Sequence, residues 1–215
     1  MTFRPLMVGV DLNRVVLDTL GALHRISCKI SGAQIPPQEF AGKNCIGKWF
    51  PAASGVGKVE FTAEHYTEAK REFFETKSFY AYAAPLPGAV ETIQRIYADG
   101  HRITLVTDVL GLPEAFLERW WHDCKLPRCE MALTRGVTSK SEQYDFCDVV
   151  VDNDHKHLRL LSQNEICLLH MLPRLGAVGG LVVSRPRGLP NTIISVRKWD
   201  EVYEHLCKMK TSVAA

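Results

Sequence analysis

The sequence predicts an α/β fold, with a doubly wound parallel sheet and a small, mostly helical domain inserted near its start. Three observations support this. Short apolar runs, several rich in valine, recur along the chain and suit strands buried on both faces of a parallel sheet. Helical periods separate most of the runs, as right-handed strand–helix–strand crossovers require. One long stretch near the N-terminus has helical periods and no such run.

The apolar runs place the strands. The first run, residues 6–10, ends at Asp11, and the second, residues 102–106, is followed by Thr107 and Asp108. Further strands are expected at residues 130–134, 148–151, 166–169, 180–183 and 192–196.

Three helices are expected between and after these strands. Pro87 and Gly88 open a helix that stops at Gly100, since proline and glycine favour these helix boundaries. A second helix begins near Glu114, and residues 199–209 form a closing amphipathic helix.

Residues 18–84 form the predicted insertion. They contain helical stretches at 19–30 and 63–76, joined through a loop with glycine and proline at 51–58. We therefore predict a core domain of residues 1–17 and 85–215 and a helical cap domain of residues 18–84.

Composition is that of an ordinary globular protein. The 215 residues are 46% hydrophobic and 23% charged, with a net charge of +2. Basic residues are scattered, which argues against nucleic acid or membrane as a partner. The seven cysteines are irregularly spaced, so we expect reduced thiols. The sequence shows no pattern typical of a signal peptide or of a bilayer-spanning segment, so we expect a cytoplasmic location. No feature of the sequence indicates the oligomeric state.

Polar residues gather at the expected strand ends. Ligands bind outside the carboxyl ends of strands in open parallel sheets. Carboxylates from several strands repel each other there unless a hard cation such as Mg²⁺ lies between them. Lys140 follows the third strand and could neutralise a phosphate or a carboxylate. The residues concerned are Asp11, Thr107, Asp108, Asp152, Asn153 and Asp154.

These residues resemble the four motifs of haloacid-dehalogenase-type (HAD) phosphatases. The first motif of that family is D-x-D-x-[TV], and here it reads DLNRV from Asp11. The second is a threonine or serine after a strand, here Thr107, and the third is a basic residue, here Lys140. The fourth is an acidic pair, here within residues 148–154.

The chain is similar to one branch in particular, the 5'(3')-deoxyribonucleotidases. The similarity spans nearly the whole chain and is carried by five segments: DLNRVVLD at 11–18, FFETKSFYAYAAPLPGAVETIQ at 73–94, ALTRGVTSK at 132–140, DVVVDND at 148–154 and ISVRKWDEVYEHL at 194–206.

This resemblance implies a two-step phosphoryl transfer from a small phosphorylated molecule of nucleotide type. Asp11 attacks phosphorus, and Thr107 and Lys140 bind the phosphoryl oxygens. Mg²⁺ is held by Asp11, the backbone carbonyl of Asn13 and an acid of the fourth motif. Arg14 and Asp108 are candidate substrate contacts. Trp49 and Phe50 fall where aromatic residues of the family's cap contact the base, although they are equally suited to the core of the cap.

The sequence departs from the family at three positions. Asn13 replaces the aspartate that protonates the leaving oxygen and then activates water, a contribution typically worth ~10²–10⁴ in rate. Arg14 replaces a small glycine. In the fourth motif, Asn153 replaces the second acid unless a shift by one residue lets Asp154 restore it, so both Asp152 and Asp154 are metal-ligand candidates.

Three hypotheses follow. The first is a Mg²⁺-dependent phosphatase, weakened by Asn13 or using another acid such as Asp108 or Asp18. The second is a phosphate- or nucleotide-binding protein that has lost the chemistry. The third is other HAD chemistry such as dehalogenation, in which the halide leaves without a proton; the acids of the fourth motif argue against it.

Overall fold

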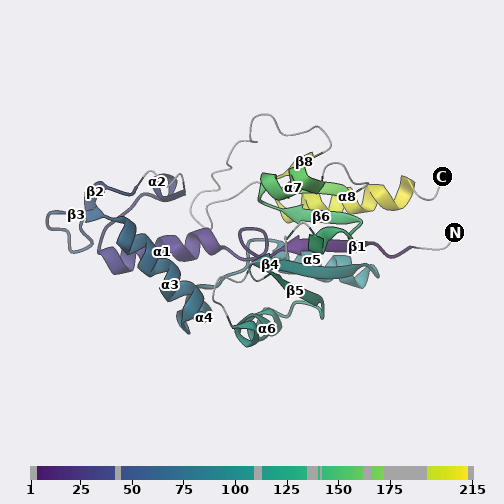
Figure 1. Ribbon diagram of the computed structural model, residues 1–215, viewed down its shortest axis with the longest axis horizontal. Helices are drawn as coiled ribbons and strands as arrows, with labels where there is room; N and C mark the ends of the chain where they lie inside the picture. The colour runs from purple at the N-terminus through teal and green to yellow at the C-terminus, as the bar shows by residue number, and fades with distance from the viewer. Residues whose placement is uncertain are drawn as a thin grey trace.

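The computed structural model describes residues 4–41, 45–108, 113–134, 140, 142–161, 166–171 and 193–212. A parallel sheet of six strands, in the order β5-β4-β1-β6-β7-β8, forms its centre (Figure 1). The strands are β1 (Met7–Asp11), β4 (Arg102–Asp108), β5 (Glu130–Thr134), β6 (Val149–Asp152), β7 (Cys167–Met171) and β8 (Ile193–Val196). Strand order reverses on either side of β1, and such a switch point is where ligands bind in doubly wound sheets.

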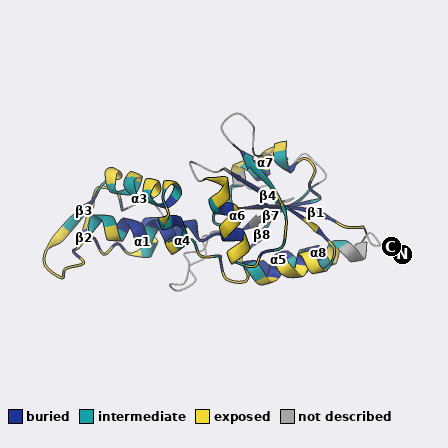
Figure 2. Cartoon of the chain, turned by 90° about the horizontal axis from the view of Figure 1, so that it is seen from below, coloured by how far each residue is buried: buried dark blue, intermediate teal, exposed yellow. Residues whose placement is uncertain are grey.

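Helices cover both faces of this sheet. The helices α5 (Ala89–Ala98), α6 (Glu114–Asp123) and α8 (Trp199–Ser212) contribute to one hydrophobic cluster. A second cluster contains residues of α7 (His155–Leu161) and the short 3₁₀ helix η1 (Glu142–Tyr144). In Figure 2, α7 lies above the sheet and α5 and α8 lie below it. The sheet is thus buried on both sides, as its valine-rich strands require.

The central strand β1 is tightly packed. Val8 and Val10 of β1 are fully buried. A Cβ atom on Gly9 would lie 2.7 Å from both Cys147 Sγ and Tyr144 Cδ1, so only glycine fits between β1 and the residues that cover it.

The elements from α1 (Thr19–Ser31) to α4 (Ser78–Tyr82) belong to the mostly helical insertion, drawn at the left of Figure 1. Its aromatic core includes Phe40, Phe61, Phe73 and Phe79, each at most 2% exposed. The insertion also contains an antiparallel pair of short strands that the sequence did not indicate. Its elements are α1 (Thr19–Ser31), α2 (Pro37–Ala41), β2 (Lys48–Pro51), β3 (Lys58–Phe61), α3 (Ala63–Glu75) and α4 (Ser78–Tyr82).

The chain enters and leaves the insertion through paired segments. The backbone N–H of Asp18 donates to the carbonyl of Ala84 at 2.8 Å, and that of Leu86 donates to Val16 at 2.7 Å. The Asp18 carboxylate then caps α1 by accepting from the backbone N–H of Gly21. The division into domains at residues 17/18 and 84/85 stays a prediction.

The predicted fold class is confirmed: the structure is an α/β fold with a parallel six-stranded sheet and a small helical insertion. The strand expected at residues 180–183 lies outside the described residues. None of the helices in the described part of the chain is long and apolar enough to cross a membrane.

Candidate functional site

The candidate site lies where β1 ends and the chain turns toward the insertion (Figure 1). Asp11 is the last residue of β1 and pairs with Val106 of β4. Its side chain is only 5% exposed. Because the carboxyl ends of parallel strands meet at one edge of the sheet, Asp11 lies next to the end of β4, which contains Thr107.

A buried lysine links two carboxylates at this edge. Lys140 Nζ lies 2.8 Å from Asp11 Oδ1 and 3.1 Å from Asp152 Oδ2. Asp152, at the end of β6, also accepts a hydrogen bond from the Tyr144 hydroxyl at 3.0 Å, and His157 Nδ1 lies 3.4 Å from its Oδ2. Asp152 is therefore in contact with three side chains, of which Lys140 is one.

Burial and these contacts shift the ionisation of all three groups. Desolvation raises the pKa of Asp11 to about 7, although the charge of Lys140 acts against it. Burial disfavours the charged form of Lys140, but the two carboxylates outweigh it and raise its pKa. Burial also acts against the charged form of Asp152, but hydrogen bonding with His157 and the charge of Lys140 hold its pKa below the usual range. Lys140 is thus a permanent cation beside Asp11.

Asn13 is fixed at both ends of its amide. Its Oδ1 accepts from the Thr19 hydroxyl at 2.9 Å, and its Nδ2 donates to Thr107 Oγ1 at 3.2 Å. Both partners are hydroxyls, which can donate as well as accept, so an aspartate at this position could keep both contacts. Asn13 itself has no proton to exchange at neutral pH. Thr107 is fully buried and does not line the cavity described below.

Arg14 occupies a strained backbone position. Its φ is +64°, in the left-handed region where a side chain costs roughly 1–2 kcal/mol. The turn is held by its N–H, which donates to the Leu17 carbonyl at 2.8 Å, and by the N–H of Leu17, which donates to the Leu12 carbonyl at 2.9 Å. This conformation accounts physically for the glycine that the resembling motif has here.

The three residues of the fourth motif, Asp152, Asn153 and Asp154, make different contacts. Asp154 Oδ1 accepts from the backbone N–H of Lys156 at the start of α7, and its own N–H donates to Asp152 Oδ1. Asn153 instead faces Asp11: one atom of its amide lies 3.0 Å from Asp11 Oδ2 and 3.1 Å from the backbone carbonyl oxygen of Asn13. The geometry therefore favours Asn153 over Asp152 or Asp154 as the third group beside Asp11 and Asn13.

This arrangement fits a magnesium ion. With its nitrogen facing Asp11, the Asn153 amide donates hydrogen bonds to Asp11 Oδ2 and to the Asn13 carbonyl oxygen; to bind a cation with these two oxygens, the amide would turn its own oxygen toward them. Neighbouring ligands of an octahedral Mg²⁺, at about 2.1 Å from the metal, lie about 3.0 Å apart. No group of three or more His, Cys, Asp or Glu within the described residues is placed to hold a metal, so carbonyl and amide oxygens have to complete such a site.

A cavity of about 290 Å³ opens at Asp11, and the insertion forms one of its walls. The core contributes Asp11, Asn13, Arg14, Lys140, Asn153, Asp154 and His157, and the insertion contributes Thr19, Leu23, Tyr66, Lys70 and Phe74. Tyr66, Lys70 and Phe74 are spaced by four residues and share one face of α3. These three residues and His157 were not among the candidates predicted from the sequence; for the three on α3, the spacing of four within the predicted helix was the available signal.

The other expected contacts do not line this cavity. Trp49 lies on β2 with 61% of its surface exposed, and Phe50 is buried in the core of the insertion. The alternative reading of Phe50, as core of the cap, therefore describes it better. Asp108 ends β4, and its backbone pairs with Thr134; its side chain is outside the described part of the structure. Asp18 caps α1 and is likewise not a lining residue, which argues against it as a substitute acid.

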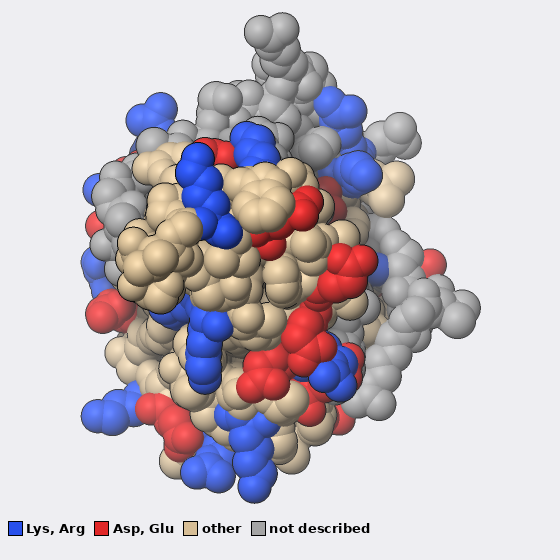
Figure 3. Space-filling view, turned by 90° about the vertical axis from the view of Figure 1, so that its left-hand side faces the viewer, with Lys and Arg blue, Asp and Glu red and all other residues tan. Residues whose placement is uncertain are grey.

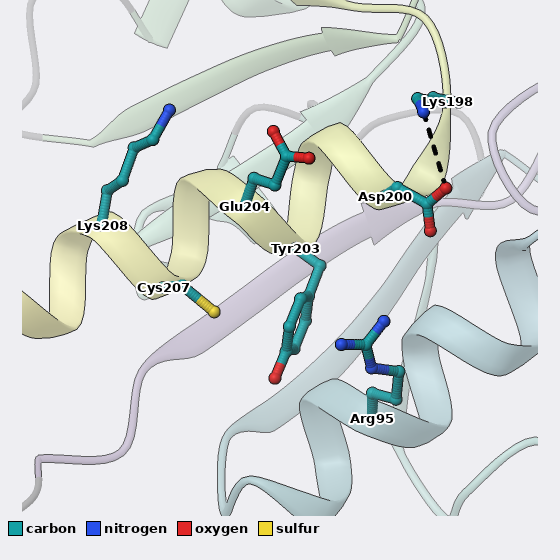
Figure 4. Close-up of a pocket in the computed structure, with 7 residues that line it drawn as sticks. All are labelled: Arg95, Lys198, Asp200, Tyr203, Glu204, Cys207 and Lys208. Atoms are coloured by element: carbon teal, nitrogen blue, oxygen red, sulfur yellow. Dashed lines mark ion pairs between the residues drawn. The ribbon is translucent and has the colours of Figure 1, made fainter.

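A larger cavity, of about 740 Å³, lies between α5 and α8 (Figure 4). Arg95 lies over the Tyr203 ring with its guanidinium carbon 4.0 Å from the ring centroid, and Lys198 pairs with Asp200 at 3.7 Å. Its lining residues come from surface helices and the turn before α8, not from a strand end, and their charges are mixed. We therefore take the cavity at Asp11 as the candidate site.

The end of the molecule formed by the insertion carries charges of both signs. Figure 3 shows lysine and arginine interspersed with aspartate and glutamate around uncharged surface. Among the residues coloured by charge on this face there is no continuous basic stripe of the kind that binds a phosphate backbone.

Solved structures share this architecture. The chain is similar to a predicted phosphatase from Clostridium acetobutylicum, with 13% identity, a TM-score of 0.58, and coverage of 95% of this chain and 100% of that one. It is also similar to YfnB from Bacillus subtilis, described as a HAD-hydrolase and bound to magnesium, with 13% identity, a TM-score of 0.56 and coverage of 95% and 99%. A predicted phosphoglycolate phosphatase from Haemophilus somnus has 14% identity, a TM-score of 0.53 and coverage of 94% and 98%.

No protein family model and no curated protein matches the sequence. At these identities the similarity establishes the fold. The chain shares its α/β architecture with these solved structures, one of which is described as a HAD-hydrolase.

Proposed function

We propose that the protein is a HAD-type phosphohydrolase that releases phosphate from small phosphate monoesters resembling nucleoside monophosphates. The observation that carries this proposal is the buried Asp11–Lys140–Asp152 arrangement at the mouth of a cavity. A carboxylate held by a lysine at the switch point of a parallel sheet is a suitable phosphoryl acceptor. The fold shared with HAD structures supports the same reaction class.

In the first step Asp11 attacks phosphorus, the bond from phosphorus to the leaving oxygen breaks, and an aspartyl-phosphate forms. Lys140 keeps Asp11 oriented and offsets the negative charge that gathers around the phosphoryl group. In the second step water attacks phosphorus, the bond to Asp11 breaks and phosphate leaves.

Magnesium would be held by Asp11, the carbonyl oxygen of Asn13 and the side-chain oxygen of Asn153. When bound, the ion neutralises phosphoryl charge and orients the transferring group. A cation beside Asp11 also favours its ionised form, which the nucleophile needs and which burial alone opposes.

The rate of the first step depends on whether the leaving oxygen needs a proton. An alkoxide leaves poorly without a proton, and Asn13 has none to give. An aryl oxide of low pKa leaves without that help, so we expect wild type to prefer aryl phosphates to alkyl phosphates. The second step lacks a base at position 13 too, so the aspartyl-phosphate should be long-lived.

The wall contributed by the insertion suits a flat, partly apolar leaving group. The rings of Tyr66 and Phe74 line the cavity together with Leu23. Stacking of a base on an aromatic ring is typically worth ~1–3 kcal/mol. Tyr66 and Phe74, and not Trp49 and Phe50, are therefore our candidates for contact with a base.

A second candidate is a phosphate- or nucleotide-binding protein without turnover. Asn13, held by Thr19 and Thr107 with both amide ends occupied, is the observation that favours it. Such a protein needs Lys140 and Arg14 to bind phosphate, but it does not need Asp11 as a nucleophile.

The test is phosphate release from deoxy- and ribonucleoside monophosphates and an aryl phosphate, with and without Mg²⁺. Wild type is compared with Asn13→Asp and Asp11→Asn. We expect Mg²⁺-dependent release by wild type that Asp11→Asn abolishes. If wild type releases no phosphate but Asn13→Asp does, the result would favour the binding protein. If neither releases phosphate, the proposal would be overturned.

A further inference from the structure

Two cations of the cavity have no acidic partner. Lys140 is neutralised by Asp11 and Asp152, but neither Arg14 nor Lys70 forms an ion pair with a carboxylate in the described part of the chain. Both line the same cavity, Arg14 from the loop after β1 and Lys70 from α3 of the insertion. Unpaired cations that converge on a cavity attract an anionic ligand.

Lys70 lies on α3 of the insertion and not at the edge of the sheet that carries Asp11. It stands between Tyr66 and Phe74 on the cavity face of α3, and its Nζ lies 5.9 Å from the centre of the Tyr66 ring. The side chains that contact Asp11 in the described part of the chain, Lys140 and Asn153, come from segments that follow strands of the sheet. Lys70 is therefore available to a second group of the same ligand.

Arg14 is a large cation at a position where the backbone favours glycine, with φ at +64°. Strained residues that persist beside a cavity are candidates for a functional role. A guanidinium binds carboxylate and phosphate with two parallel hydrogen bonds, which a lysine does not do.

The departures from the resembling motifs all change charge in one direction. Asn13 and Asn153 each stand where that pattern has an acid, and Arg14 stands where it has an uncharged glycine. The site is thus more positive than the motif pattern, and the unpaired Lys70 adds to this on the facing wall.

From these observations we infer that the site takes a phosphate monoester that carries a second anionic group, a carboxylate or another phosphate, bound by Lys70 and Arg14. The inference rests on the proposed function, because it assumes that the first phosphate lies at Asp11. It narrows the substrate class from any small monoester to those with at least one further negative charge.

The test uses two matched pairs of probes with the whole protein and Mg²⁺. Glycerol 3-phosphate is compared with 3-phosphoglycerate, which differs by a carboxylate, and adenosine 5'-monophosphate with adenosine 3',5'-bisphosphate. Dissociation constants are measured by calorimetry, and phosphate release is followed in the same samples. In at least one pair we expect the probe with the extra anion to bind about tenfold more tightly at low salt, and less so at high salt. The pair that responds distinguishes carboxylate from phosphate.

Lys70→Gln should remove most of this preference, so that the two probes of the responding pair bind within about twofold of each other. Lys58→Gln is the matched control, because it removes the same charge from an exposed residue of β3 that does not line the cavity. Arg14→Gln should weaken the preference as well, and a normal thermal transition would show that both variants are folded.

Suppose that the monoesters bind and release phosphate. Equal affinity within both pairs, or a preference that persists in Lys70→Gln, would then overturn the inference and leave the proposed function standing. If no probe binds and neither wild type nor Asn13→Asp releases phosphate, the proposed function fails first and the inference with it.

Discussion

The edge of the sheet and the wall of the insertion form one cavity but are built differently. At the edge, Asp11, Lys140 and Asp152 are buried and joined by ion pairs of 2.8–3.1 Å. On the wall, Tyr66 and Phe74 are half-buried, Lys70 is exposed, and no ion pair between described residues restrains that lysine. From this difference we propose that the residues at the edge carry out the chemical step and that the residues of the wall select the ligand.

The largest effect is expected from breaking the edge. Lys140→Met leaves two buried carboxylates facing each other without a cation, which should lower the free energy of unfolding by roughly 3–5 kcal/mol. Urea unfolding measures this change. The exposed Lys48→Met, which breaks the ion pair with Glu39, is the control and should change stability by at most about 1 kcal/mol. Equal effects of the two would show that Lys140 does not hold the edge together.

A change on the wall should alter affinity more than the chemical step. Tyr66→Leu removes a ring that lines the cavity, so KM should rise about tenfold for an aromatic ester while kcat stays within about threefold. Steady-state kinetics with the aryl phosphate measures both constants. Trp49→Ala removes an exposed ring outside the cavity and should leave both unchanged. A loss of kcat alone in Tyr66→Leu would contradict the division between edge and wall.

Relief of strain should stabilise the protein slightly. Arg14→Gly removes a side chain from a positive φ, and the gain is partly offset by the greater freedom of glycine in the unfolded chain, so about 1 kcal/mol or less is expected. Lys125 also has a positive φ, of 57°, and does not line the cavity. Lys125→Gly should therefore show the same gain without the loss of ligand binding that Arg14→Gly causes. Thermal unfolding with and without adenosine 3',5'-bisphosphate, which carries the second anionic group, compares the two.

The smallest effect concerns pH. The contact with Asp152 raises the pKa of His157 above its ordinary 6.5. The folded state thus holds this proton more tightly than the unfolded state. The resulting stability is fully present below pH about 6.5 and is lost as pH rises through the folded pKa. Melting temperatures of wild type and His157→Gln, measured from pH 5 to 9 without metal, should differ more at the acidic end. A difference independent of pH would contradict this.

The sequence was sufficient for the sheet and for its edge. Asp11, Thr107 and Asp152 follow or end apolar runs, and the strand-end rule brings such residues together whatever the loops do. The sequence was insufficient to identify Asn153, because a shift of one residue in the turn after β6 would align Asp154 instead of Asn153 with the second acid of the fourth motif. Only the observed contacts, with Asp154 at the start of α7 and Asn153 facing Asp11, favour one register.

The insertion was harder to predict for a different reason. The helix at residues 63–76 was expected, but which of its faces meets the cavity depends on how the insertion packs on the core. The pair β2 and β3 was missed, since each strand has four residues and a glycine-containing turn separates them. Trp49 and Phe50 lie on β2, so the expectation that they contact a base depended on an element that the sequence did not reveal.

The central claim is that Asp11 accepts a phosphoryl group and that Asn13 slows its release. The most direct measurement is intact-protein and peptide mass spectrometry after brief incubation with an aryl phosphate and Mg²⁺, for wild type, Asn13→Asp and Asp11→Asn. We predict a phosphoryl group on the peptide that contains Asp11 in wild type. We also predict little accumulation with faster turnover in Asn13→Asp, and none in Asp11→Asn. Phosphate release by wild type that persists in Asp11→Asn, or no modified peptide in any variant under turnover, would contradict it.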